Sequence, residues 1–380
     1  MIPRVAWCNR SLPRGHPVAA RLACGYAAIC LGWLLPPAGW SADEAALPVR
    51  GLHAAAPRAE DLPISLRFIR EALAKEGVNT LVLEFGYRYQ FARRPEVAEA
   101  DALSKDEVKA LLAACREAGI RLIPQINLLG HQSWSKNTGA LLRAHPEFDE
   151  TPGKYPNNEG IYCRSYCPLH PQVHEVVLDL IDELAEACEA DAFHAGMDEV
   201  FLIGEDDCPR CKGRDKAELF AQEVRTLRDH LAGSNRTLWI WGDRLLEGSQ
   251  TGIGKWEASQ NETHPAVRLI PKDVVICDWH YERAVPTATW FALEGFQVVS
   301  APWRKAGVAL AQLEQIREAR RHATPAVAAR LLGMLQTTWT GGLGTIAKTY
   351  YLEGTVNPRA LEAVTCFRAL FEELRTGGLR

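Results

Sequence analysis

Short apolar runs alternate with helical patterns from residue 49 almost to the end of this 380-residue chain, and no other feature restricts its fold as strongly. Runs rich in β-branched and aromatic residues favour buried strands, and amphipathic segments between them favour crossover helices. We expect strands at residues 49–55, 79–85, 120–127, 191–196, 237–241, 274–279, 296–300 and 333–339. Eight such units in one uninterrupted stretch predict an α/β fold, a single (β/α)8 TIM barrel.

The segments between these strands carry apolar residues at helical spacing. A capping box, Ser104 with Glu107 three residues later, predicts one helix start. The segment 256–270 lacks a clear period, and we expect it to be mostly loop. The other helices are predicted near residues 60–76, 171–189, 214–231, 283–294, 305–322 and 358–375.

The first 42 residues have the composition of an export signal. Four arginines and no acidic residue precede or flank the apolar run 22–35, which is followed by two prolines and small residues. The apolar run is too short to span a bilayer. We therefore expect residues 1–42 to be a leader, residues 43–380 to be the barrel, and the protein to be exported to the periplasm or the extracellular space.

The charge of the chain argues against nucleic acid as a partner. The formal net charge is −4, and without the four leader arginines 39 basic residues remain against 47 acidic ones, a net charge of −8. No basic surface is indicated, and stable insertion into a membrane is not expected. The hydrophobic content of 47 % is ample for a large core.

Eleven cysteines divide into three groups. Three belong to the leader, and Cys115, Cys188, Cys277 and Cys366 lie in apolar patterns that predict core positions. The remaining four fall in predicted loops, where disulfides, a structural metal site or free thiols are all compatible with the pattern. They are Cys163, Cys167, Cys208 and Cys211. None of these readings makes the cysteines catalytic.

Acidic and aromatic residues gather at the predicted carboxyl ends of the strands, the face on which barrel enzymes carry their active sites. The stretch "FHAGMDEVF" sets Asp198 and Glu199 side by side directly after the strand 191–196. Aromatic faces stack on the apolar faces of sugar rings. Four tryptophans fall at or just after the ends of the last four strands: Trp241, Trp279, Trp303 and Trp339.

Two consecutive carboxylates cannot flank a sugar from opposite sides, as ordinary glycoside hydrolysis requires. They can cooperate when the 2-acetamido carbonyl of the substrate itself attacks the anomeric carbon. One carboxylate then holds the acetamido N–H while its neighbour acts as general acid. Proximity also favours one of the two staying protonated. An acetamido sugar would therefore explain the Asp-Glu pair.

Three motifs resemble those of family 20 glycoside hydrolases, the β-N-acetylhexosaminidases. "FHAGMDEV" is similar to the family's His-x-Gly-Gly-Asp-Glu signature, "IPQINLLGHQSW" to its third-strand segment, and "RGLHAAAPR" (50–58) to its first-strand frame. The resemblance covers about residues 49–340. It departs at Met197, where the signature has a second Gly, at Ala55 and Asn127, where Asp is usual, and at Thr340, where many members have Glu.

The resemblance implies a role for each matching residue. Asp198 would hold the acetamido N–H, and Glu199 would be the acid and later the base. The sugar-binding residues would be Arg58, His131, Trp241, Asp243, Trp279, Tyr281, Trp303 and Trp339, with Tyr281 donating to the acetamido carbonyl. No cofactor and no catalytic metal are implied.

We therefore predict an exo-acting β-N-acetylhexosaminidase that acts with retention on glycans ending in N-acetylhexosamine. Two alternatives stay open. One is a barrel that binds carbohydrate without hydrolysing it. The other is a retaining glycosidase for a sugar without the acetamido group, in which Glu84 or Asp243 is the nucleophile.

Overall fold

The computed structural model describes residues 47–354 and 357–377. The expected leader, residues 1–42, lies outside the described residues. The chain divides into two units, residues 1–40 and 41–380, and the description below concerns the second.

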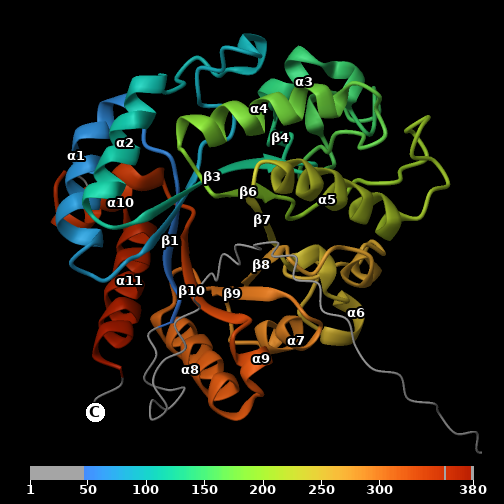
Figure 1. Ribbon diagram of the computed structural model, residues 1–380. Helices are drawn as coiled ribbons and strands as arrows, with labels where there is room; N and C mark the ends of the chain where they lie inside the picture. The colour runs from blue at the N-terminus through green and yellow to red at the C-terminus, as the bar shows by residue number, and fades with distance from the viewer. Residues whose placement is uncertain (1–46, 355–356, 378–380) are drawn as a thin grey trace, which may run out of the picture. The chain divides into compact units, whose positions relative to one another are not determined.

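Eight parallel strands close into a barrel, which confirms the predicted fold class (Figure 1). Each strand overlaps the run of residues from which it was predicted, because runs of β-branched and aromatic residues fit a sheet that is covered on both faces. The barrel strands are β1 (Val49–Ala55), β2 (Thr80–Glu84), β3 (Arg121–Leu128), β6 (Ala192–Gly196), β7 (Thr237–Trp241), β8 (Val275–Trp279), β9 (Gln297–Ala301) and β10 (Leu331–Thr338). A small hairpin in the loop after β3 consists of β4 (Ser133–Trp134) and β5 (Asn137–Thr138).

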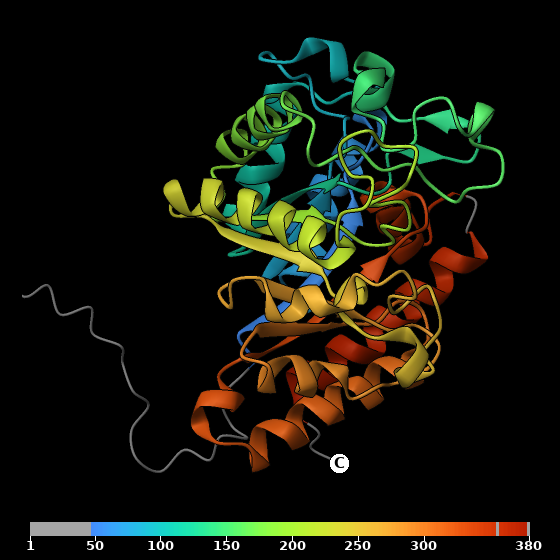
Figure 2. The same ribbon diagram turned by 90° about the vertical axis from the view of Figure 1, so that its right-hand side faces the viewer.

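Helices surround the strands in both ribbon views (Figures 1 and 2). The capping box at Ser104 is formed, and the weak segment 256–270 holds only a short 3₁₀ helix, His264–Arg268, as expected. The sequence did not predict α10. The longer helices are α1 (Leu62–Arg67, continued by a π-helical segment Phe68–Leu73), α2 (Lys105–Glu117), α4 (Val173–Ala187), α5 (Lys216–Gly233), α7 (Thr287–Leu293), α8 (Ala306–His322), α10 (Gly342–Tyr351) and α11 (Pro358–Thr376), and the shorter ones are α3 (Ala140–Ala144), α6 (Gly248–Thr251) and α9 (Pro325–Ala328).

Alternation along the strands separates two apolar cores. On β7, Leu238 and Ile240 belong to the cluster shared with the surrounding helices. Trp239 and Trp241 belong to a second cluster, contributed almost entirely by strand residues, which fills the barrel interior. Successive side chains of a strand point to opposite faces, so this division follows from the period of two.

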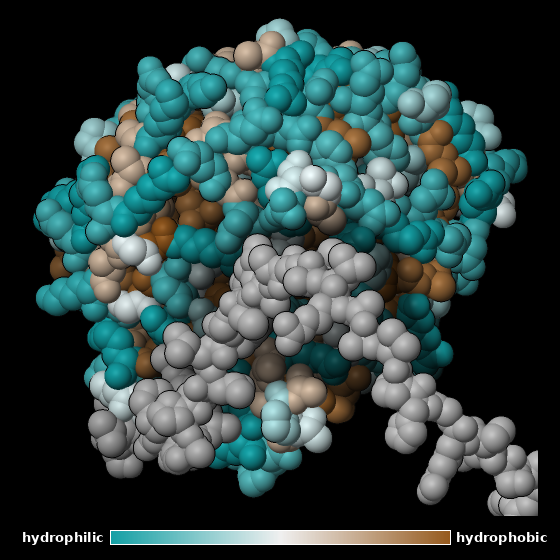
Figure 3. Space-filling view, in the orientation of Figure 1, coloured by the Kyte–Doolittle hydropathy of each residue, from teal (hydrophilic) through white to brown (hydrophobic). Residues whose placement is uncertain are grey.

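Hydrophilic residues cover most of the face shown in Figure 3, and smaller groups of hydrophobic residues lie between them. Within residues 47–354 and 357–377, no helix is both long and apolar enough to cross a bilayer.

Candidate active site

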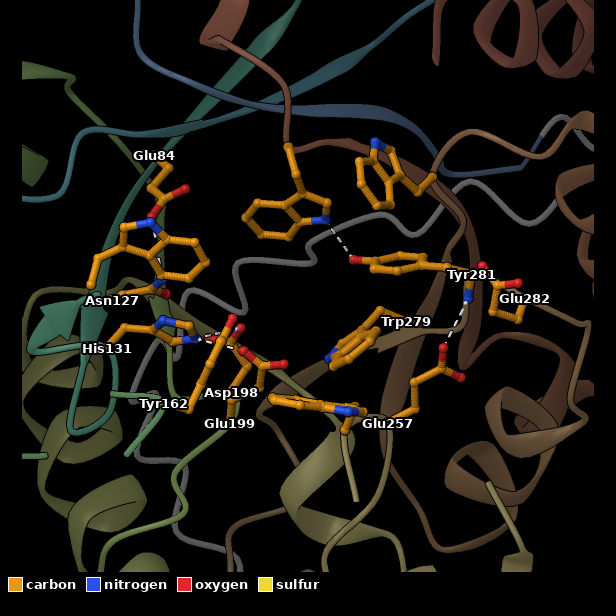
Figure 4. A pocket seen from close by; sticks show the side chains of 14 residues that line it. Glu84, Asn127, His131, Tyr162, Asp198, Glu199, Glu257, Trp279, Tyr281 and Glu282 are labelled. Atoms are coloured by element: carbon orange, nitrogen blue, oxygen red, sulfur yellow. Dashed lines mark hydrogen bonds and ion pairs between the residues drawn. The ribbon is translucent and has the colours of Figure 1, made fainter. Parts of the chain in front are cut away.

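A pocket of about 450 Å³ opens at the carboxyl ends of the barrel strands (Figure 4). Its lining residues come from the ends of the strands and from the loops that follow them. They are Glu84, Asn127, His131, Trp134, Tyr162, Asp198, Glu199, Trp256, Glu257, Trp279, Tyr281, Glu282, Trp303 and Trp339. The pocket therefore brings together seven of the ten residues selected from the sequence.

The backbone after β6 turns both adjacent carboxylates into this pocket. Gly196, Met197 and Glu199 all have positive φ angles, of 66°, 67° and 50°. A Cβ atom at Gly196 would lie 1.8 Å from the side-chain oxygen of Asn127, so only glycine fits there. Met197, which stands where the family signature has glycine, is buried in the left-handed conformation that is costly for such a side chain. This local strain at the end of β6 belongs to the site itself.

His131 joins the two carboxylates. Its Nε2 lies 3.2 Å from Asp198 Oδ2 and 3.2 Å from Glu199 Oε2. Burial opposes the charged imidazole, but the attraction of Asp198 and the hydrogen bonds to both carboxylates raise the pKa of His131 well above its usual range. His131 is therefore a cation at neutral pH, and it lets two acidic side chains approach each other in a buried site.

Asp198 keeps one oxygen without a protein partner. Its Oδ2 faces His131, while Oδ1 is buried and makes no hydrogen bond within the described part of the chain. A buried carboxylate oxygen without a donor is costly. An N–H group of a bound ligand would satisfy it.

Asp243, expected to bind sugar hydroxyls, does not line the pocket. It is buried beneath it, where Oδ2 accepts the backbone N–H of Glu199 at 2.9 Å and the Arg244 Nε–H at 2.6 Å. Its Oδ1 accepts the indole N–H of Trp279 at 3.2 Å. Burial raises the pKa of Asp243 to about 6, and Arg244 opposes that rise. Asp243 thus positions Glu199 and Trp279, and this placement corrects both its predicted sugar contact and its alternative role as nucleophile.

Trp241 also lies below the pocket instead of in its wall. It is fully buried and packs on His53 and His194, with ring centroids 5.2 and 4.5 Å away. Strand register explains the difference, because Trp241 pairs with Cys277, two residues before Trp279 on β8. The stagger of barrel strands therefore sets Trp241 one layer deeper than Trp279.

The other three selected tryptophans and Tyr281 form one wall of the pocket. Tyr281 packs on Trp279 and Trp303, with ring centroids 4.9 and 5.5 Å apart. Its hydroxyl accepts the Trp339 indole N–H at 2.6 Å. That bond leaves the Tyr281 proton free to be donated to a ligand, and burial keeps it in place by raising the pKa of Tyr281 well above its usual range.

Residues that were not selected as site residues from the sequence complete the lining of the pocket. Trp134 and Trp256 pack edge-on against Tyr162, with centroids 5.5 and 4.9 Å away, and expose 62 % and 42 % of their surface. Burial and the neighbouring Glu199 raise the pKa of Tyr162. Glu257 is held by His280 Nδ1 at 2.7 Å. Trp256 and Glu257 belong to the loop segment without periodicity, and a tryptophan next to an acid in the sequence was the only signal there.

Arg58 lies outside this pocket. It lines a neighbouring hollow together with Glu84 and Trp339. Its side chain is 64 % exposed, and its nearest acidic partner is Asp101 at 4.0 Å. Glu84 and Trp339 line both the hollow and the main pocket, so the sugar contact expected of Arg58 from the first-strand motif stays a prediction.

Glu84, the other alternative nucleophile, does line the pocket. It accepts a hydrogen bond from Asn127 Nδ2 at 3.2 Å. Burial, followed by repulsion from Asp198, raises its pKa. A raised pKa favours the neutral acid, which can donate to a hydroxyl but is a poor nucleophile.

The loop cysteines do not pair as two local disulfides. All eight cysteines of the described chain are free and buried. Cys163 lies beside the pocket, with Sγ 3.6 Å from the backbone oxygen of Glu199. The other three gather elsewhere with Glu150. The ligand atoms of these four residues lie within 4.8 Å of one another. The same holds separately for His131, Asp198 and Glu199, so each of the two groups contains atoms able to hold a metal ion.

Comparison with known proteins agrees with this geometry. The profile "Glycosyl hydrolase family 20, catalytic domain" matches residues 78–362. A β-hexosaminidase of Vibrio furnissii is 26 % identical over 202 residues, which are 52 % of this chain and 30 % of that protein. A β-hexosaminidase of Akkermansia muciniphila is 31 % identical over 112 residues, 29 % of this chain and 22 % of that protein. The chain thus spans less than a third of the length of these curated relatives.

Solved structures of the same family share the fold. The chitobiase of Flavobacterium johnsoniae superposes with a TM-score of 0.60 at 18 % identity, over 88 % of this chain and 52 % of that one. The exo β-N-acetylglucosaminidase of Vibrio harveyi, in complex with N-acetylglucosamine, superposes with a TM-score of 0.56 at 18 % identity, over 88 % of this chain and 57 % of that one. With its closed barrel, its Asp-Glu pair after β6 and a family profile that matches most of its length, the chain belongs to glycosyl hydrolase family 20.

Proposed function

We propose that this protein is an exo-acting β-N-acetylhexosaminidase that removes terminal β-linked N-acetylhexosamine from a glycan with retention of configuration. One observation carries the proposal: Asp198 and Glu199, adjacent in the chain, face the same pocket beside a protonated His131. The family of the chain and the named activity of its relatives support it.

In the first step the acetamido carbonyl oxygen of the substrate attacks its own anomeric carbon. Glu199 donates its proton to the glycosidic oxygen, so that the bond to the leaving group breaks and a cyclic oxazolinium ion remains. Asp198 stabilises the positive charge that develops on the acetamido N–H. Its Oδ1, which has no partner in the described part of the chain, is available to accept a hydrogen bond from that N–H. Tyr281, whose oxygen already accepts from Trp339, donates to the carbonyl oxygen and orients it.

In the second step Glu199 accepts a proton from water. The water oxygen attacks the anomeric carbon, the ring of the intermediate opens and the acetamide is restored. Two displacements at one carbon give net retention. His131 remains protonated and offsets the negative charge of Asp198, and that of Glu199 between the two steps.

The pocket fits a terminal sugar. Its volume of about 450 Å³ lies in the lower half of the range of small-molecule sites. Trp279, Tyr281, Trp303 and Trp339 form a wall on which the apolar face of a pyranose can stack. Trp134 and Trp256, the most exposed of the lining tryptophans, are placed to contact the next residue of the glycan.

The test is release of 4-nitrophenol from three β-glycosides, those of N-acetylglucosamine, N-acetylgalactosamine and glucose. We expect turnover of the acetamido sugars alone. Glu199→Gln should lose about 10²–10⁴-fold in kcat/KM on a disaccharide substrate and less on 4-nitrophenyl glycosides, whose leaving group needs little protonation. Asp198→Asn should lower kcat more than it changes KM. Glu318→Gln, at an exposed position of α8, is the matched control.

Each contrary outcome has a definite meaning. Hydrolysis of the plain glucoside would favour a glycosidase that does not use the acetamido group. Sugar binding without turnover of any substrate would favour a non-hydrolytic barrel. Equal losses in Glu199→Gln on good and poor leaving groups would remove the acid role from Glu199.

We also propose that residues 1–42 direct export, on the strength of their basic residues and short apolar run. Cell fractionation followed by N-terminal sequencing of the mature protein tests this. A protein that stays in the cytoplasm with its first 42 residues attached contradicts it.

A further inference from the structure

Three thiols and one carboxylate from two different loops converge outside the lining of the pocket. Glu150 and Cys167 come from the loop after β3, and Cys208 and Cys211 from the loop after β6. Their ligand atoms all lie within 4.8 Å of one another, and all four side chains are buried. The proposed hydrolysis uses none of them.

The thiols are arranged as a trio and not as a bonded pair. Cys167 Sγ lies 3.4 Å from Cys211 Sγ and 3.4 Å from Cys208 Sγ. A disulfide would require about 2.05 Å. Thiolates around a tetrahedral zinc ion, each about 2.3 Å from the metal, lie about 3.8 Å apart. The observed spacing of Cys167 to both partners is therefore close to that of ligands around one ion.

Glu150 supplies an independent observation. It is fully buried, and one carboxylate oxygen accepts the backbone N–H of Glu205 at 3.1 Å. The other oxygen, Oε2, has no hydrogen-bond partner within the described part of the chain. A buried carboxylate oxygen without a donor beside three thiols is costly unless a cation completes the group.

We propose that Glu150, Cys167, Cys208 and Cys211 bind one Zn²⁺ ion as a closed, structural site. Thiolate ligands select zinc over harder cations such as Mg²⁺ or Ca²⁺, and a carboxylate is an accepted fourth ligand. Four protein ligands leave no open position, so this ion stabilises the structure and takes no part in the hydrolysis.

Zinc binds cysteine as the thiolate, so metal binding would displace the thiol protons of the group.

The ion would tie together the two loops that supply the catalytic residues. The loop after β3 carries His131 and Tyr162, and the loop after β6 begins with the Asp-Glu pair. Tyr166 is next to Cys167, and its backbone N–H donates to the backbone oxygen of Leu129 at 2.9 Å. Leu129 precedes His131 by two residues. Loss of the metal should therefore loosen the pocket as well as lower the melting temperature.

The first measurement is the zinc content of the untagged full-length protein, by inductively coupled plasma mass spectrometry. We expect about one zinc per chain. Co²⁺ substituted for zinc should give the charge-transfer absorption of thiolate ligands. The variant Cys208→Ser should lose the metal, and Glu150→Gln should weaken binding about tenfold or more. Cys366→Ser, at a buried cysteine of α11 outside the group, is the matched control and should keep the full zinc content.

Two results would overturn the proposal. One is a metal-free native protein in which mass spectrometry finds Cys167 bonded to Cys208 or Cys211. The other is a metal-free protein whose thiols are all reactive after denaturation and which does not bind added Zn²⁺ or Co²⁺. If Cys208→Ser does not fold, Glu150→Gln decides, since circular dichroism can verify its fold and unchanged Co²⁺ affinity would contradict the site.

Discussion

The buried His280 provides a quantitative test of how the wall of the pocket is held. It follows β8, with Nδ1 2.7 Å from Glu257 Oε2, and Nε2 2.7 Å from Thr287 Oγ1 and 3.2 Å from Asp278 Oδ1. Burial lowers the pKa of His280, but Asp278 and Glu257 outweigh that effect and raise it from 6.5 to about 9. The imidazolium therefore anchors Glu257, which lines the pocket.

The raised pKa translates into a pH-dependent stability. One pKa unit corresponds to about 1.36 kcal/mol, so the rise from 6.5 to about 9 corresponds to about 3 kcal/mol. Because the folded state binds the proton more tightly than the unfolded state, this stability is fully present below pH 6.5 and is lost as the pH rises through 9. The variant His280→Gln lacks the titrating group and should lack this dependence.

Urea unfolding at pH 6 and pH 10 measures the effect. The difference in unfolding free energy between the wild type and His280→Gln should shrink by about 3 kcal/mol between these pH values. The hydrogen bonds that His280→Gln loses also lower the unfolding free energy, but by the same amount at both pH values. His322→Gln, whose side chain is 73 % exposed, is the control and should follow the wild type. A difference that is equal at pH 6 and pH 10 would refute the assignment of a charged, ion-paired His280.

Three further substitutions test the geometry of the site. Asp243→Asn should lower kcat about tenfold or more and change KM less, because Asp243 holds the backbone of Glu199 and the indole of Trp279 without lining the pocket. Steady-state kinetics that show a change in KM alone would contradict this. Trp256→Ala should raise KM for an oligosaccharide about tenfold and leave KM for a 4-nitrophenyl monosaccharide nearly unchanged, since stacking is worth roughly 1 kcal/mol; equal effects on both substrates would place the indole elsewhere. Gly196→Ala should destabilise the fold by about 3 kcal/mol or more in thermal unfolding, because the new methyl group meets a side-chain oxygen and φ is positive. Its control, Gly307→Ala on α8, has open space and should be neutral or stabilising.

Much of the barrel could be predicted because its signals are local. Each strand is a short apolar run, and each crossover helix is an amphipathic segment, so the order of elements follows from periodicity alone. The position of Asp198 and Glu199 could be predicted for the same reason, since the carboxyl end of any barrel strand lies on the active face. Trp279, at the end of β8, follows the same rule.

Other features depend on how distant segments pair and pack. The register between β7 and β8 sets Trp241 one layer below Trp279, although both are the last residues of their strands. The backbone turn at His131, with a φ of 55°, brings its imidazole to two carboxylates from another strand. Neither a strand register nor a left-handed turn leaves a trace in the hydrophobic pattern.

The positions of the remaining residues depend on the paths of the loops. The sequence grouped Cys163 with Cys167 by proximity in the chain, but folding separates them and replaces Cys163 by Glu150 in the buried group. Trp256 and Glu257 reach the pocket from a segment without periodicity. The sequence by itself determined the barrel and the chemical pair at the end of its fourth strand, because both depend on neighbours along the chain. Only the tertiary structure decided which side chains surround that pair, because the stagger of the strands and the course of the loops arise from long-range packing.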